Sequence, residues 1–434
     1  MEETKKNPIT EGVIWKEMML FCIPIMLGTL VQQLYNMVDV MVVGHFVGTI
    51  ALAAVGGSAS MIIYLVTGFF TGLCGGITVV VSQACGENNQ RKIHLAVHTT
   101  IALSLVGGVL LSILGYVFTP FLLNLMDTPE ETMEGATLYL HIYFLGMIFV
   151  FLYNAGAAIL RAMGDTRRPL IYLIACSAAN IILDVVLVCF VHMGIAGVAI
   201  ATVTAQAISA ILTLGALLHE EGAARLEPAK VRFESVTLGK IIRIGLPGGM
   251  QSVMNSVSGM IMSAAVNGIG TYAVAGNTAY AKLDGIYWMV SGAFSVAIAT
   301  FVGQNYGARK YDRMKKSIWV CLGLDAAISA FLSVFFFFTS SILLLLFTSD
   351  PLVLEQALIV MKAIAPYYAI VVIYDILGGA LRGMGDVFWP MLMNIAGLCG
   401  VRALWVLFVS PVYVDLYHII ISCPVSWVCT SQEK

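Results

Sequence analysis

The chain is a succession of long apolar stretches separated by short polar segments. A hydrophobic run of about 20 residues is long enough to cross a bilayer as a helix, and such runs recur throughout the sequence. We expect twelve spans, at about 17–44, 50–83, 94–118, 135–160, 168–191, 195–218, 239–266, 273–302, 317–347, 354–381, 387–409 and 412–430. The last contains Asp415, His418 and Pro424, which leaves two interpretations open, a truncated helix and a partly inserted one.

An internal repeat divides these spans into two halves. LRAMGD at Leu160–Asp165 recurs 221 residues later as LRGMGD at Leu381–Asp386, and SQACGE at Ser82–Glu87 is matched in the same way by GQNYGA at Gly303–Ala308. Because six spans is an even number, both halves enter the membrane from the same side. We therefore predict an all-α integral membrane protein of twelve helices in two pseudo-two-fold-related six-helix lobes. The expected boundaries are 1–218 for the first lobe, 219–238 for a cytoplasmic linker and 239–434 for the second lobe.

Composition and charge support a membrane protein and give its orientation. Hydrophobic residues make up 59% of the chain and charged residues 11%, whereas soluble domains have about 25% charged residues. Lys and Arg gather in alternate loops, as at Arg91–Lys92 and Arg167–Arg168, and the loops between them are acidic, as at Glu130–Glu131. Basic loops stay in the cytoplasm. We expect both termini there, in a multi-pass protein of the cell inner (plasma) membrane that acts as a monomer.

The first span carries the clearest candidate for function. It contains Pro24, which removes a backbone hydrogen bond and bends the helix, and the carboxylate of Asp39. A charged side chain inside a bilayer costs roughly 2.5–3.5 kcal/mol, so its presence indicates a function. At 1.5 Å rise per residue, Asp39 lies roughly 12 Å from the outer end of its helix. Asp184, Asn180 and Thr202 fall at the same depth in spans five and six.

These four oxygen-bearing side chains predict a cation site. Asn180 and Asp184 are four residues apart and therefore share a helix face. Clustered oxygens suit Na⁺, a hard cation, or a proton held between two carboxylates. The plainer interpretation for Asn180 and Thr202 is hydrogen bonding between helices. No other metal, disulfide or cofactor is expected, because the nine cysteines are scattered without a CxxC motif.

The second half does not reproduce this set. The positions 221 residues beyond Asn180 and Asp184 are Val401 and Trp405. Further polar residues are assigned to a substrate cavity, where the aromatic ones could stack on organic cations: Gln33, Tyr35, Tyr139, Gln251, Asn255, Lys282, Asp284 and Asp375. Lys282 and Asp284 are two residues apart and so face different sides of their helix.

By its motifs the chain resembles the MATE (multidrug and toxic compound extrusion) transporters over nearly its full length. The resemblance is carried by PIMLGTLVQQLYNMVDVMVVG at Pro24–Gly44, by GLPGGMQSV at Gly245–Val253 and by the two repeated motif pairs. It implies two six-helix lobes, export driven by inward H⁺ or Na⁺, a cation site at Asp39, Asn180, Asp184 and Thr202, and bending of the first helix at Pro24. Some family members carry an acid in the seventh helix, where this chain has Gln251 and Asn255.

We therefore expect a secondary active antiporter that exports amphipathic, often cationic, organic compounds in exchange for H⁺ or Na⁺. Its partners would be these small compounds and the lipid bilayer, with no nucleic acid. Three other functions remain open. A flippase for lipid-linked sugars would place Lys282, Lys362 and Arg402 in one cavity; an intramembrane enzyme would use the paired acids; a passive channel would not drive uphill export. The chain has neither GxxxxGK[ST] nor HExxH, so ATP hydrolysis and zinc proteolysis are not predicted.

Overall fold

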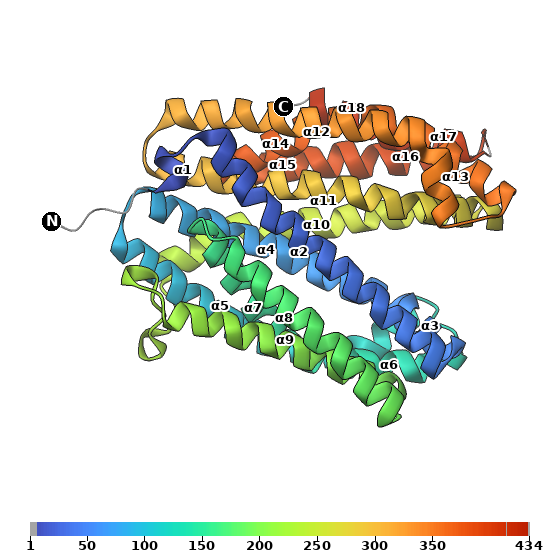
Figure 1. Ribbon diagram of the computed structural model, residues 1–434, viewed down its shortest axis with the longest axis horizontal. Coiled ribbons are helices and arrows are strands. Elements are labelled where there is room, and N and C mark those ends of the chain that lie inside the picture. The colour runs from blue at the N-terminus through green and yellow to red at the C-terminus, as the bar shows by residue number, and fades with distance from the viewer. Residues whose placement is uncertain (1–6, 414, 433–434) are drawn as a thin grey trace. The chain divides into compact units, whose positions relative to one another are not determined.

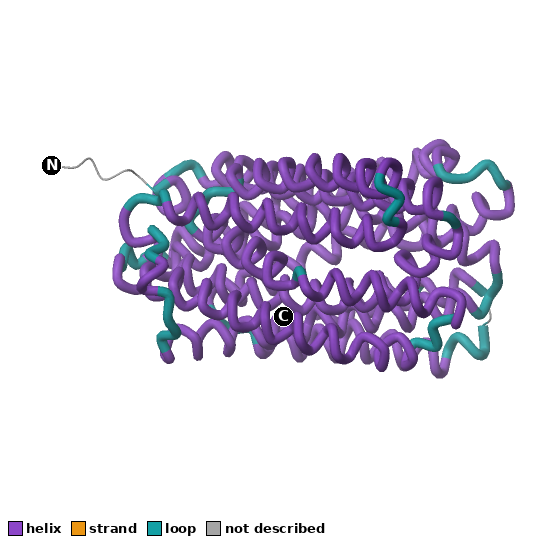
Figure 2. Tube along the Cα trace, turned by 90° about the horizontal axis from the view of Figure 1, so that it is seen from below, coloured by secondary structure: helices purple, strands orange, loops and turns teal. Residues whose placement is uncertain are grey.

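A computed structural model describes residues 7–413 and 415–432, and these contain helices, turns and loops but no β-strand (Figures 1 and 2). The helices of the first half are α1 (Pro8–Glu11), α2 (Ile14–Val42), α3 (Thr49–Ala54), α4 (Ser60–Gly86), α5 (Gln90–Leu125), α6 (Glu130–Leu145), α7 (Met147–Ala162), α8 (Arg167–Asp184) and α9 (Gly194–Leu218). Those of the second are α10 (Ser235–Asn267), α11 (Thr271–Gly307), α12 (Tyr311–Leu343), α13 (Pro351–Ile364), α14 (Tyr368–Met384), α15 (Phe388–Asn394), α16 (Val401–Phe408), α17 (Leu416–Ile420) and α18 (Ser422–Gln432). Short π-helical or 3₁₀ segments continue several of them: η1 (Val43–Val47), η2 (Val55–Ala59), η3 (Val185–Phe190), η6 (Leu344–Leu346), η7 (Ala365–Tyr367) and η8 (Ile395–Gly400). Two further 3₁₀ turns, η4 (Gly222–Ala224) and η5 (Pro228–Lys230), lie between α9 and α10.

These elements correspond in order to the expected spans. Among the described residues, nine continuous helices are long and apolar enough to cross a bilayer, and the α6–α7 pair makes a tenth. The seventh expected span is α10, which is 33 residues long but rich in Gly, Ser and Asn. The twelfth expected span corresponds to α17 and α18, whose apolar part, Leu416–Ser431, is short.

The fourth span is broken where the sequence predicts one helix. α6 and α7 meet at Gly146 with a bend of 50°. A Cβ at Gly146 would lie 2.6 Å from a methyl group of Val203 on α9, so the glycine allows the close approach of α9. α6, α7 and α9 pack together in this part of the chain.

The chain divides into two compact units by its internal contacts. The N-unit is Ile23–Leu246, and the C-unit is Pro247–Lys434 together with Met1–Cys22. Both divisions fall inside a helix: α2 passes from the C-unit to the N-unit beside Pro24, and α10 passes from the N-unit to the C-unit at Pro247. These bounds differ from lobes defined by the repeat, because the first turns of α2 and α10 pack with the opposite half of the sequence.

Close backbone contact and a docked linker hold the first part of α10 in the N-unit. A Cβ on Gly76 of α4 would lie 2.6 Å from the backbone nitrogen of Gly245 on α10. Such an approach requires glycine on both helices. The linker preceding α10 is fixed to α5, because the backbone N–H of Glu227 donates to Nε2 of the buried His98 at 3.0 Å. His98 Nδ1 lies 2.7 Å from the carbonyl oxygen of His94, which fixes the ring.

The core of the C-unit is built around α11. This helix packs against α12, α13 and α14 (Figure 1). The rings of Tyr287 on α11 and Tyr368 on α14 stack at 3.9 Å, and the hydroxyl of Tyr287 donates to the Tyr368 carbonyl at 3.0 Å. The N-terminal segment joins this unit through Arg313 on α12, which donates to the carbonyl oxygens of Ile9 and Gly12. The start of α2 is thus anchored to the C-unit.

Candidate functional site

Two acids of the N-unit each lie at the point where an α-helix changes to a π-helix. Asp39 lies on α2 four residues before η1, and Asp184 is the last residue of α8, directly before η3. η1 and η3 contact one another. π-helical turns are rare and occur frequently at functional sites. Both acid-bearing helices therefore lose regular geometry in the same part of the unit.

The carboxyl groups of Asp39 and Asp184 are hydrogen-bonding neighbours. Asp184 is fully buried and Asp39 is partly buried. As two carboxylates, neither can donate to the other, and both oxygens of Asp184 and Oδ1 of Asp39 are buried with no donor from the protein. If one of the two is protonated, its O–H can donate to the other. Two carboxyl groups placed in this way can share a proton or bind a cation.

The other two predicted site residues are Asn180, which lies on α8 four residues before Asp184, and Thr202, which lies on α9, a helix that packs against α8. Asn180 is 1% exposed, and neither atom of its amide has a hydrogen-bond partner. The buried Thr202 hydroxyl donates to the carbonyl of Val198 at 3.0 Å, which leaves its oxygen free to accept. Buried polar groups without partners are uncommon and call for an explanation. A cation bound nearby would supply a partner for the Oδ1 atom of Asn180 but not for its Nδ2 donor.

This chemistry suits a monovalent cation better than a transition metal. Within the described residues no group of three or more His, Cys, Asp or Glu side chains could hold a metal ion. All nine cysteines are free. Two carboxylates with an amide and a hydroxyl form an all-oxygen donor set, which hard cations prefer.

Tyr35 and Tyr139 are the two aromatic cavity candidates in the N-unit, and both lie within electrostatic reach of Asp39. They are 7% and 8% exposed. Tyr139 also stacks on the buried Tyr143, with ring centroids 6.3 Å apart. Gln33, by contrast, is exposed. The buried tyrosines thus form part of the surroundings of the acid pair, and Tyr143 belongs with them.

The other cavity candidates belong to the C-unit and fall into separate environments. Gln251 is buried, whereas Asn255 and Lys282 are exposed. Asp375 accepts hydrogen bonds from Ser291 and Ser295, each at 3.0 Å. Asp284 forms no ion pair with Lys282, as their spacing predicts. Its carboxylate accepts from Tyr368 and Trp288 instead.

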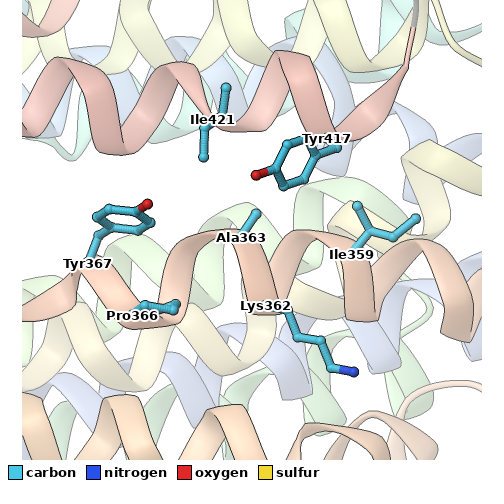
Figure 3. A pocket seen from close by; sticks show the side chains of 7 residues that line it. All are labelled: Ile359, Lys362, Ala363, Pro366, Tyr367, Tyr417 and Ile421. Carbon is cyan, nitrogen blue, oxygen red and sulfur yellow. The ribbon is translucent and has the colours of Figure 1, made fainter.

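The three cations that would favour a flippase do not share one cavity. Lys282 is exposed. Lys362 lines a shallow cavity between α13 and α17 through its aliphatic stem, and its amine points away from Tyr417 and Ile421 (Figure 3). Arg402 lines a different cavity of the C-unit.

One buried acid was not assigned to any site from the sequence. Asp325 on α12 is fully buried; Ser329 donates to its Oδ1 at 3.3 Å, and its Oδ2 has no partner. In the sequence, the sign that could have identified Asp325 was an acidic residue in the middle of an apolar run. The indole N–H of Trp427 is also buried without an acceptor, and the sequence gives no signal for this, because indoles are common at membrane interfaces.

Together these features describe a multi-pass α-helical membrane protein with paired acids buried in one unit. Comparison with known proteins agrees with this class. The family model MatE matches residues 24–186 and 247–406, which is more than half of the chain. The two matched segments begin at Pro24 and Pro247.

Curated relatives and solved structures give the same result. The probable multidrug resistance protein YoeA of Bacillus subtilis is 28% identical over 92% of this chain and 89% of its own length. The probable multidrug resistance protein NorM of Thermotoga maritima is 28% identical over 93% and 87%. A multidrug resistance MATE-family transporter of the MOP superfamily, solved in an outward-facing conformation, is 19% identical and superposes with a TM-score of 0.91, covering 100% of this chain and 97% of that one.

The chain belongs to the MatE family of membrane transporters. The structural match covers the full length, so the predicted fold of twelve helices in two six-helix lobes is confirmed.

Proposed function

We propose that the protein is a secondary active antiporter that exports amphipathic, often cationic, organic compounds in exchange for H⁺ or Na⁺. The observation that carries the proposal is the acid pair of the N-unit. Asp39 and Asp184 come from two helices, their carboxyl groups are neighbours, and buried oxygens of both lack a donor. A buried, uncompensated charge is costly, so the pair is expected to persist because it binds an ion.

Coupling would follow from the position of Asp39 on α2. A cation bound between Asp39 and Asp184 would link α2 to α8 and favour one shape of the first helix. Release would remove that link, and α2 contains Pro24, where the backbone lacks a hydrogen bond. A ligand shifts a conformational equilibrium only through its different affinities for the two states. Here the cation would bind one state more tightly because Asp39 lies close to Asp184 only in that state.

The substrate class is supported by two observations. Relatives that match nearly the whole chain are named multidrug resistance proteins. Buried Tyr35 and Tyr139 next to the acids offer aromatic surface to an organic cation. The basic loops further support a bacterial plasma-membrane protein with both termini in the cytoplasm, and we expect it to act as a monomer without a cofactor.

The alternative is a flippase of the same superfamily that moves lipid-linked sugars. Such a protein would need cationic side chains gathered in one cavity to bind pyrophosphate. Lys282, Lys362 and Arg402 instead lie in three different environments. This arrangement favours the antiporter.

The decisive experiment is substrate uptake into inverted membrane vesicles, with a pH gradient and a Na⁺ gradient imposed separately. Ethidium would accumulate above its equilibrium level under one of the two gradients. In Asp39→Asn and Asp184→Asn the uphill accumulation should fall to that of vesicles lacking the protein, because an amide replaces the carboxylate that binds the cation. Thermal unfolding should show that both variants remain folded.

The matched control is Asp127→Asn, which removes an exposed carboxylate from a loop where Asp127 has φ 48°, a conformation that Asn also adopts. This variant should transport like the wild type. Wild-type uphill transport in both acid variants would refute the assignment of the pair. Accumulation that never exceeds equilibrium would indicate a channel, and substrate turnover in detergent without transport would indicate an enzyme.

A further inference from the structure

A second polar cavity lies within the C-unit, and the proposed antiport mechanism does not use it, although the sequence assigned Asp284 to a substrate cavity. Its volume is about 190 Å³, which is enough for a ligand of several non-hydrogen atoms. It is partly open and is lined by residues of α10, α11, α13, α16, α17 and α18. The residues used in the argument are Tyr280, Asp284, Trp288, Arg402 and Trp427, all of which line it.

One side of the cavity presents a carboxylate with only neutral partners. Asp284 Oδ1 accepts from the hydroxyl of Tyr368 at 2.7 Å, and Oδ2 accepts from the indole N–H of Trp288 at 2.9 Å. These two bonds fix the carboxylate, and each oxygen can accept again. Within the described chain, no basic side chain lies within 4.0 Å of it. The carboxylate is therefore held in place without a direct ion pair, while Arg402 acts on it electrostatically from a greater distance.

Another part of the cavity wall presents the guanidinium of Arg402, which also has only neutral hydrogen-bond partners. Arg402 is 8% exposed; its Nε donates to the hydroxyl of Ser426 at 3.1 Å and its Nη1 to that of Ser258 at 3.2 Å. Both acceptors are neutral, and no described carboxylate lies within 4.0 Å. Since a guanidinium has five N–H donors, several remain for a ligand. The guanidinium is thus fixed in place by neutral acceptors, without a direct ion pair.

Trp427 supplies an independent sign that the cavity is made for a ligand. Its side chain is 3% exposed, and its indole N–H has no acceptor from the protein. Leaving a buried donor unsatisfied costs about 1–3 kcal/mol. The rings of Trp427 and Trp288 meet edge to face at 6.3 Å, so Trp427 is held by packing although its polar atom is unpaired. An acceptor inside the cavity would complete it.

We propose that this cavity binds a small zwitterion, an amino acid or a betaine. Its ammonium group would meet Asp284, with Trp288 and Tyr280 offering aromatic faces to the cation. Its carboxylate would accept hydrogen bonds from Arg402 and Trp427. Asp284 and Arg402 line one cavity yet stay more than 4.0 Å apart, so a molecule that carries both charges satisfies both residues at once. A lone cation or a lone anion would leave the opposite charge uncompensated.

This site is independent of the proposed coupling mechanism, because its residues belong to the C-unit and none of the acids of the N-unit takes part. The test is therefore a binding measurement on the purified full-length protein, not a transport assay. Glycine betaine, L-alanine and L-proline serve as zwitterion probes, tetramethylammonium as the isolated cation and acetate as the isolated anion. At least one zwitterion should bind, as measured by calorimetry, and should raise the unfolding temperature. Its affinity should be at least tenfold higher than that of tetramethylammonium or acetate.

Three variants locate the binding. Trp427→Phe keeps the ring and removes only the N–H, and it should weaken zwitterion binding about tenfold, the loss of one hydrogen bond to a charged group. Asp284→Asn should abolish zwitterion binding and leave acetate binding to Arg402. Trp389→Phe alters an exposed indole outside the cavity and should bind like the wild type.

The proposal fails if no zwitterion binds to the wild-type protein, or if acetate or tetramethylammonium binds as tightly as the zwitterions. It also fails if Trp427→Phe and Asp284→Asn both bind like the wild type. A double variant, Asp284→Asn with Arg402→Met, guards against misfolding, because removing both charges together leaves neither buried alone. It should fold, as judged by its unfolding transition, and show no response to any zwitterion.

Discussion

At the scale of single residues, the N-unit keeps polar atoms that its own packing does not satisfy. Asn180 is the clearest case, since both atoms of its buried amide lack partners. Elsewhere in the same unit, Asn154 donates its amide hydrogen to the carbonyl of Val150 at 2.8 Å. The two asparagines have similar chemistry, but only Asn154 contributes to stability. The contrast makes Asn180 the candidate for binding and leaves Asn154 satisfied by its own helix.

We predict that Asn180→Leu stabilises the protein and impairs its transport. Removing a buried amide without partners should raise the free energy of unfolding by about 1–3 kcal/mol, while the cation loses a neutral ligand. Thermal unfolding and gradient-driven uptake measure the two effects. Asn154→Leu is the control and should not be stabilised, because it loses a hydrogen bond. A destabilised Asn180→Leu variant would mean that the amide has a structural role.

Neighbouring glycines in α4 provide a second comparison at this scale. A Cβ on Gly76 would lie 2.6 Å from the backbone of Gly245 and Ile241, whereas a Cβ on Gly75 would meet nothing within 4 Å. Gly76→Ala should therefore lower stability by about 1–3 kcal/mol through overpacking, whereas Gly75→Ala should keep or slightly raise it, because alanine favours the helix where its Cβ meets nothing. The unfolding temperatures of the two variants check this prediction. Equal temperatures would show that α4 and α10 can separate freely.

At the scale of elements, the ends of two helices are held by short segments outside the bilayer-spanning regions. The segment around α1 is bound to α12 by Arg313, which donates to the carbonyls of Ile9 at 3.1 Å and Gly12 at 2.5 Å. The linker before α10 is bound to α5 through His98. Each attachment joins a backbone segment to a helix of its own unit. The starting points of α2 and α10 are thus fixed by tertiary contacts.

Arg313→Ala should release the segment before α2. Three hydrogen bonds to backbone carbonyls are lost, but the side chain is partly exposed, so we expect a loss of only about 1 kcal/mol in stability. The main effect should be faster hydrogen–deuterium exchange at residues 9–13, measured by mass spectrometry. Lys316→Ala removes the same charge from an exposed position of α12 and should leave this exchange unchanged. Unchanged exchange in both variants would show that Arg313 does not hold the segment.

At the scale of the whole molecule, two helices begin in one unit and continue in the other. α2 changes unit between Cys22 and Ile23, next to Pro24, and α10 changes unit at Pro247. Proline removes one backbone hydrogen bond from a helix and lets it bend. Any movement of one unit against the other must pass through these two helices. Their prolines lie where the required bending would occur.

Pro24→Ala should stiffen α2 and slow transport. The alanine restores a helical hydrogen bond, so the unfolding temperature should stay the same or rise, while the initial rate of gradient-driven uptake falls several-fold. Pro120→Ala is the matched control, because Pro120 also lies inside a helix, but α5 belongs to the N-unit throughout. That variant should keep its transport rate. Equal rates in both variants would exclude bending at Pro24 from the transport cycle.

The sequence alone was sufficient for the features that depend on hydrophobicity, length and repetition. Apolar runs mark the spans because backbone polar groups in lipid must be satisfied within a helix, and the repeated LRAMGD and LRGMGD motifs reveal the two lobes. The rise per residue placed Asp39 and Asp184 at one depth. The motifs also identified the family, which the family model confirms.

Only the tertiary structure decided how side chains at one depth are arranged around the helix axes. Depth says nothing about direction, so the meeting of Asp39 with Asp184 had to come from the packing of α2 on its neighbours. The fourth span bends at Gly146, which also lets Val203 of another helix approach closely, and no local pattern encodes that contact. Trp427, Arg402 and Asp284 enclose one cavity from three separate helices. The sequence determines what each helix is, and long-range packing determines which of its polar groups find partners and which are left for a ligand.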